Sequence, residues 1–139
     1  MSLPKQKLRE IVFHLLYSDH FEPFQEDNIF FLMEYHKTTK KYLFMAQDTV
    51  KAIRTSLEKI DELIQKYATG YEFDRIPQVE KSLLRLGIFE ILYDQETPPK
   101  VAISEAMRLT RKFATTEGSG FINAILDTIY QAQKDPNES

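Results

Sequence analysis

The chain has 139 residues, of which 42% are hydrophobic and 28% charged, a balance typical of one soluble globular domain. The sequence has no apolar run of about 18 residues and begins with the charged stretch MSLPKQKLRE, so we expect neither a transmembrane helix nor a secretory signal. The absence of cysteine excludes disulfides and thiolate metal sites, and the net charge of −3 argues against non-specific binding to nucleic acid.

Sparse glycine and proline, four and six residues respectively, indicate an all-α fold of long helices. The first helix is expected to begin near Pro4, because proline is tolerated in a first turn, and to end before Pro23. Residues 26–45 combine a short apolar helical face with a polar tail. A long helix is expected over residues 41–67, where apolar residues recur at helical spacing before Gly70.

Three further helices are expected in the second half of the chain. The first begins just after Asp74 and contains VEKSLLRLGIFEIL, residues 79–92. The second follows VAI at 101–103, an expected extended lead-in, and begins at Ser104, whose hydroxyl can accept a bond from a first-turn amide. The last follows TTEGSG, an expected loop in which Ser119 is another N-cap candidate.

The helix over residues 79–92 carries a carboxylate in an unusual place. Its apolar face comprises Val79, Leu83, Leu84, Leu86, Gly87 and Ile91. We expect Lys81, Ser82 and Arg85 on the opposite side of the helix. Glu90 instead projects among the apolar residues. A buried carboxylate is costly without hydrogen bonds or a cation, so Glu90 needs a specific partner.

Catalytic and metal-binding chemistry is not indicated by this sequence. His14, His20 and His36 lack partners at a metal-binding spacing, and we expect all three to be solvated. EGSG at 117–120 lacks the spacing of a phosphate-binding loop, so a turn between helices is favoured. With no nucleophile–base arrangement, the chain is expected to be no enzyme and to need no cofactor or metal.

Positive charge gathers at two places in this acidic chain. Residues 1–9 contain three basic residues and no acid, and three lysines follow an acidic stretch at 19–34. These basic residues are Lys5, Lys7 and Arg9, and Lys37, Lys40 and Lys41. Two interpretations are open, a local basic patch or ordinary solvated helix faces.

Three blocks of sequence, taken in order, resemble one family. They are REIVFHLLYS at 9–18, QVEKSLLRLGIFEI at 78–91, and the stretch from PPKVAISEAMRLTRKF to GSGFINAILDTI at 98–129. Their order and spacing resemble the NusB family of bacterial transcription antitermination factors. Outside residues 19–66, where only helical character matches, the resemblance covers nearly the whole chain. It implies two three-helix bundles packed together, in agreement with sub-bundles expected at about 1–68 and 74–134 of one domain over 1–139.

The resemblance also implies a function and partners. NusB proteins bind the boxA element of nascent RNA jointly with NusE, which is also a small-subunit ribosomal protein. The complex helps to bring RNA polymerase into an antiterminating, processive state, notably on ribosomal RNA operons. The chain is therefore expected to be a bacterial, cytoplasmic protein that binds single-stranded RNA and joins the RNA polymerase antitermination complex. Whether it forms a homodimer that hides the RNA face is open.

The resemblance places RNA contacts near both ends of the chain. The basic stretch KQKLRE would meet phosphates, although the family's end is richer in arginine, which unlike lysine can grip a phosphate with two bonds. Aromatic residues would stack on bases, and the segment before Phe121 would meet phosphates or base edges. For Phe121 a place in the core is an equal alternative. The expected RNA-binding residues are Lys5, Lys7, Arg9, Tyr17, Gly118, Ser119 and Phe121.

The resemblance places the protein partner on the second half of the chain. The expected contacts are Asp74, Glu80, Arg85, Phe113 and Glu117. For Arg85, a tether between helices is an equal alternative. Structural roles are expected for Glu90, Ser104 and Asn123, with Glu90 accepting bonds from backbone amides of the VAI–Ser104 lead-in.

Two other functions fit the same features. A NusB-like domain forms the amino-terminal part of some ribosomal RNA cytosine methyltransferases, although a glycine-rich cofactor-binding unit is missing from this sequence. A helical adaptor without RNA binding is the second, and the thin basic end favours it.

Overall fold

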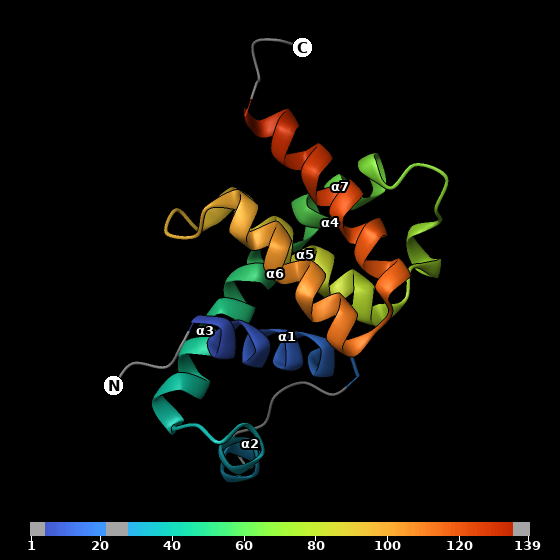
Figure 1. The fold of residues 1–139 in the computed structure, drawn as a ribbon. Coiled ribbons are helices and arrows are strands. Elements are labelled where there is room, and N and C mark those ends of the chain that lie inside the picture. Colours follow the sequence, from blue (N-terminus) through green and yellow to red (C-terminus); the bar gives the residue numbers. More distant parts are fainter. Residues whose placement is uncertain (1–4, 22–27, 135–139) are drawn as a thin grey trace. The chain divides into compact units, whose positions relative to one another are not determined.

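The described part of the chain is helical, which confirms the predicted all-α class. The computed structural model describes residues 5–21 and 28–134, so the expected boundaries at Pro4 and Pro23 lie outside it. In chain order the elements are α1 (Lys5–Phe21), α2 (Ile29–His36), α3 (Lys40–Thr55), α4 (Leu57–Tyr67), the short 3-10 helix η2 (Phe73–Arg75), α5 (Gln78–Tyr93), α6 (Pro99–Phe113) and α7 (Thr116–Lys134) (Figure 1). Within these ranges no helix is long and apolar enough to cross a membrane.

The first of two compact units is Met1–Thr55. In it, α1 and α2 each pack on α3 (Figure 1). The buried residues of α3 follow one helical stripe: Leu43, Ala46, Val50 and Ile53. α2 differs, because Ile29 and His36 are its only buried residues.

The prediction of one long helix over residues 41–67 is wrong, because α3 ends at Thr55 and α4 begins after Ser56. The Thr55 hydroxyl donates to the carbonyl oxygen of Lys51 at 3.0 Å, a local bond that competes with the helical ladder and bends helices. The second unit, Ser56–Ser139, starts at this break rather than between the sub-bundles expected from the sequence.

The second unit is built around α5, which contacts α4, α6 and α7. Because neighbours cover α5 on several sides, Lys81 and Ser82, which lie opposite the predicted apolar face, are buried as well. The Nζ atom of Lys81 lies 4.2 Å from the centroid of the Phe73 ring, a cation–π contact that compensates for burial of the charge. At Gly87 a β-carbon would lie 2.7 Å from Cδ1 of Leu126, so glycine permits the close approach of α5 and α7.

The residues predicted to be structural have mixed outcomes. α6 begins at Pro99, a residue type suited to a first turn, so VAI at 101–103 is helical and exposed Ser104 lies inside the helix. The N-cap role predicted for Ser104 is therefore wrong. Asn123 is exposed on α7, and its structural role stays a prediction. Glu90 is 6% exposed, and its bonding to amides near the start of α6 stays a prediction.

Candidate nucleic-acid and protein interface

EGSG forms the first turn of α7 and is not a loop. Thr115 caps this helix, since its Oγ1 accepts a bond from the amide of Gly118 at 2.8 Å. The amide of Ser119 donates a hydrogen bond to the carbonyl oxygen of Thr115 at 3.3 Å. The hydroxyl of Ser119 donates a hydrogen bond to the carbonyl oxygen of Thr116 at 2.6 Å. Both Gly118 and Ser119 are buried. The predicted N-cap role of Ser119 is therefore wrong, and the burial contradicts the predicted RNA contacts of both residues.

The first turn of α7 packs against Glu80 of α5. A β-carbon at Gly118 would collide with Oε1 of Glu80 and would lie 3.2 Å from Cγ2 of Thr110. Desolvation raises the pKa of the half-buried Glu80 carboxyl. The position of this carboxyl beside a helix N-terminus is electrostatically favourable for its charged form. Gly118 was predicted to contact RNA and Glu80 to contact a protein. The two residues lie together, and the carboxyl of Glu80 is half-buried.

Phe121, about one turn further along α7 than Gly118, forms an aromatic pair with Tyr71, which follows α4. The ring of half-buried Phe121 meets that of Tyr71 edge to face, with centroids 4.7 Å apart and an interplanar angle of 63°. Tyr71 is 61% exposed and follows Gly70, whose φ of 85° turns the chain after α4. Phe121 is therefore neither fully in the core nor fully exposed. The sequence does not single out Tyr71, because a lone tyrosine after a helix stop has no recognisable spacing.

Arg85 is a tether between α5 and α4. Its Nε and Nη2 atoms donate to the two carboxylate oxygens of Asp61 at 2.9 and 3.0 Å, in the bidentate geometry of a strong ion pair. The side chains are only 14% and 18% exposed. The alternative of an internal tether is therefore the one observed, and a contact of Arg85 with a protein partner stays a prediction.

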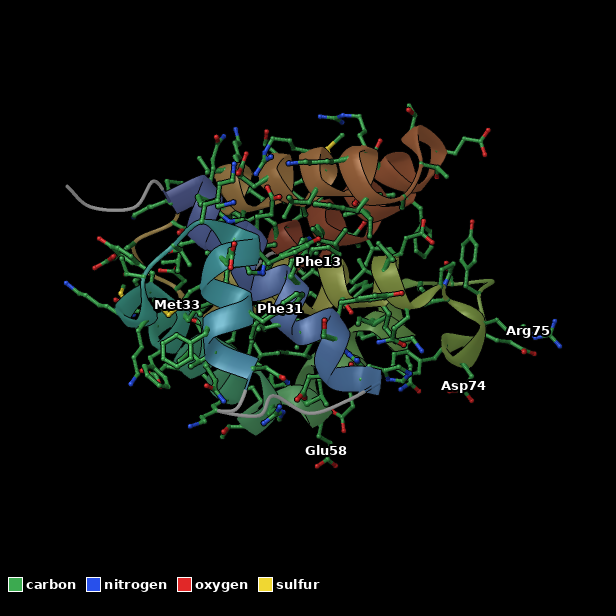
Figure 2. All side chains as sticks on the ribbon, turned by 90° about the horizontal axis from the view of Figure 1, so that it is seen from below. Phe13, Phe31, Met33, Glu58, Asp74 and Arg75 are labelled. Carbon is green, nitrogen blue, oxygen red and sulfur yellow. The ribbon has the colours of Figure 1, made fainter. Side chains whose placement is uncertain are left out.

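The other residues predicted to meet a protein are accessible. Asp74 in η2 and Glu117 in the first turn of α7 are exposed, and Phe113 at the end of α6 is half-buried. Figure 2 shows Asp74 and Arg75 extending outward from η2. With Glu80, these residues give the second unit three carboxyl groups and one partly exposed aromatic ring for a partner.

The amino-terminal candidates for RNA binding all lie on α1. Lys5 is exposed, and Lys7 and Tyr17 are half-buried. The ring of Tyr17 lies 6.1 Å from that of Phe13 on the same helix. Arg9 is only 9% exposed, and its contact with RNA phosphates stays a prediction. Lys5, Lys7 and Tyr17 are the more accessible candidates on α1.

Two histidines pair in the first unit. The rings of His14 on α1 and His36 on α2 have centroids 5.1 Å apart, and His36 is 3% exposed. Burial, followed by the charges of His14 and Lys7, lowers the pKa of His36 to about 4, while Glu10 opposes the shift. The prediction that all three histidines are solvated is wrong for His36. Among the described residues no group of three potential ligands is placed to hold a metal ion.

Comparison with known protein families shows which family the chain belongs to. The NusB family model matches residues 6–131. The chain belongs to the NusB family. A transcription antitermination protein NusB from Natranaerobius thermophilus is 34% identical over 121 residues, which cover 86% of each chain. Another, from Thermodesulfovibrio yellowstonii, is 30% identical over 148 residues, covering 99% of this chain and 98% of the relative.

Solved NusB structures have the same fold as this chain. NusB from T. maritima matches with a TM-score of 0.79 and 28% identity, covering 94% of this chain and 93% of that one. A structure of the antitermination factors NusB and NusE in complex with dsRNA matches with a TM-score of 0.76 and 25% identity, covering 92% of this chain and 96% of that one. These findings confirm the NusB-like fold and the family that the three sequence blocks indicated.

Proposed function

We propose that this chain is a transcription antitermination factor that binds the boxA element of nascent RNA jointly with NusE. The observation that carries the proposal is the NusB family match over residues 6–131, joined to a structural neighbour whose complex contains NusE and dsRNA. In the cytoplasm, the complex would support processive transcription of ribosomal RNA operons by RNA polymerase. The chain would act by binding alone, without catalysing a reaction or holding a cofactor.

The RNA contacts of the proposed factor are few. Lys5 and Lys7 on α1 supply cations for phosphates, and Tyr17 and Phe121 supply rings for bases, with Tyr71 beside Phe121. Because each neutralised phosphate adds to the salt-dependent part of the affinity, Lys5 and Lys7 alone would bind RNA weakly. We therefore infer that tight binding requires the partner protein.

The protein contacts have the charge that suits a ribosomal protein. Ribosomal proteins bind RNA, and such proteins carry excess positive charge on the surfaces that face it. Asp74 and Glu117 are exposed carboxyl groups on the second unit, Glu80 is a half-buried one, and Phe113 adds an apolar contact. Opposite charges of this kind steer association and fix its orientation.

The test measures binding of a boxA-containing RNA and of a scrambled RNA, each with and without NusE, at two salt concentrations. Tighter, boxA-selective binding in the presence of NusE is the expected result, and the affinity should fall as salt rises. Folded protein that shows no selectivity in any mixture would refute the antitermination role. That outcome would favour a helical adaptor without RNA binding.

A further inference from the structure

α2 carries an exposed aromatic surface that the proposed function does not use. Phe30, Phe31 and Tyr35 are 77%, 67% and 61% exposed on this helix of 8 residues. The rings of Phe31 and Tyr35 stack, with centroids 6.0 Å apart and 27° between their planes (Phe31 is labelled in Figure 2). These three residues are here called the α2 aromatic face, and the ring of Tyr35 also meets that of the buried His36 edge to face, with centroids 4.9 Å apart. Exposed apolar surface of this kind marks a binding site.

A group of lysines follows the α2 aromatic face directly in the chain. Lys37 caps α2 in the left-handed conformation, with φ of 50°, and Lys40 and Lys41 begin α3. All three, here called the lysine cluster, are exposed. The Nζ atoms of Lys40 and Lys41 lie 5.6 and 5.8 Å from the ring centroids of Phe44 and Tyr42. Aromatic and cationic side chains therefore occur together from α2 into α3.

This surface adjoins the lysines of α1 within the same unit. The ring of His14 on α1 lies 6.0 Å from that of Tyr35 and 5.1 Å from that of His36. Lys7 precedes His14 by about two helical turns on the same face of α1. The contacts of His14 with Tyr35 and His36 therefore place the face of α1 that carries Lys7 next to α2. The α2 aromatic face thus borders a residue already proposed to meet RNA phosphates.

We propose that the α2 aromatic face and the lysine cluster bind single-stranded RNA, extending the RNA surface of α1 along the first unit. This inference rests on the proposed function. Unpaired bases stack on the rings of Phe30 and of the Phe31–Tyr35 pair, and phosphates of the same strand lie against the lysine cluster. Stacking of this kind tolerates any base, so the site holds RNA that flanks boxA and does not read its sequence.

The charges favour RNA over a protein as the occupant. The acid of α2, Glu34, is exposed. Because its negative charge repels phosphates at short range, we place the phosphates at the end of α2 where the lysine cluster lies. Protein interfaces are enriched in aromatic residues but depleted in lysine. Rings combined with several lysines are instead the combination that single-strand binding grooves use.

The test of the rings uses the full chain with NusE and an RNA that extends beyond boxA on both sides. Phe31→Ser combined with Tyr35→Ser removes the stacked pair, together with the ring contacts of Tyr35 with His14 and His36. The matched control is Tyr93→Ser, which removes a 43% exposed ring from the end of α5. Circular dichroism of each variant checks that the fold is kept.

The test of the cations compares two pairs of lysines. Lys40→Gln with Lys41→Gln removes two members of the lysine cluster. The control is Lys59→Gln with Lys66→Gln on α4, where both lysines are exposed and Lys66 Nζ also lies near a tyrosine ring, 5.2 Å from the centroid of Tyr67. The two double variants therefore remove equal charge from similar surroundings.

We expect the ring variant to bind the long RNA roughly tenfold or more weakly, as loss of base stacking does elsewhere. The lysine variant should lower the slope of log affinity against log salt by about 1.4, because a single strand releases about 0.7 counterion for each phosphate that is neutralised. Both variants should keep their affinity for NusE, and both controls should match the wild type.

Three results overturn the inference, and they separate it from the proposed function. If the wild type binds the RNA and both variants bind it with affinities within about twofold of the wild type, the inference fails and the proposed function stands. Unchanged RNA binding with lost NusE binding or lost self-association shows that a protein covers the α2 aromatic face. A wild type that binds no RNA refutes both ideas together.

Discussion

Replacing Arg85 with alanine removes both hydrogen bonds that join α5 to Asp61 on α4, of 2.9 and 3.0 Å. The Asp61 carboxylate then stays 18% exposed or slightly more, without its cation. An exposed ion pair contributes about 0–1 kcal/mol, whereas breaking a fully buried one costs about 3–5 kcal/mol. Since both side chains lie between these limits, we expect the free energy of unfolding to fall by about 2 kcal/mol.

Urea unfolding followed by circular dichroism measures this loss, and a thermal melt should show a fall in Tm of about 8 °C, at about 4 °C per kcal/mol for a chain of this size. Asp61→Ala should cost a similar amount. The Arg85→Ala, Asp61→Ala double variant should be less destabilised than the sum of the two single variants, because the same interaction is lost in each.

Arg75 provides a matched control. It pairs with Glu72 at 3.0 Å, but the two side chains are 84% and 77% exposed. Arg75→Ala should therefore change stability by less than about 0.5 kcal/mol. The tether is refuted if Arg85→Ala is as harmless as Arg75→Ala while NusE affinity falls tenfold or more, a result that would return Arg85 to the partner surface.

Three further predictions concern local contacts. Gly118→Ala should destabilise the fold by about 1–3 kcal/mol in urea, because the new methyl group meets Glu80; a neutral effect would show that Glu80 moves aside freely. Thr115→Ala should cost about 1 kcal/mol through loss of the α7 cap, and Thr115→Ser, which keeps the hydroxyl, should not. The free energy of unfolding should fall by up to about 3 kcal/mol as the pH drops from 7 to 4, because unfolded His36, with a pKa of 6.5, takes up a proton that the folded residue, with a pKa of about 4, does not. His36→Asn should lack this part of the pH dependence, and an unchanged profile would contradict the assignment to His36.

Local signals in the sequence predicted the presence of helices better than their ends. Thr115, Ser119 and Ser104 are all residue types that cap helices, so composition alone could not choose among them. The structure chose Thr115 for α7, since the turn that follows packs Gly118 against Glu80. For α6 it chose Pro99 as an early helical residue, and Ser104 became part of an exposed helix surface.

The candidate site divides in the same way. Lys5, Lys7, Tyr17 and Phe121 came from the resemblance to the family, and none of them is fully buried. The aromatic partner of Phe121 escaped notice because nothing in the chain links it to a residue so far along the sequence. The sequence shows the three lysines after α2 only as a local excess of positive charge. The exposed aromatic rings beside them, which the structure shows, indicate a binding surface.

The sequence by itself determined the all-α class and the NusB family, because helical periodicity and ordered blocks are properties of residues near one another in the chain. Only the tertiary structure decided the fates of Lys81, Arg85 and His36. Periodicity identifies one buried face of a helix, but it cannot show that α5 has neighbours on several sides, or that Arg85 meets a carboxylate 24 residues away. Such contacts depend on where packed helices bring distant residues together, and that information exists only in three dimensions.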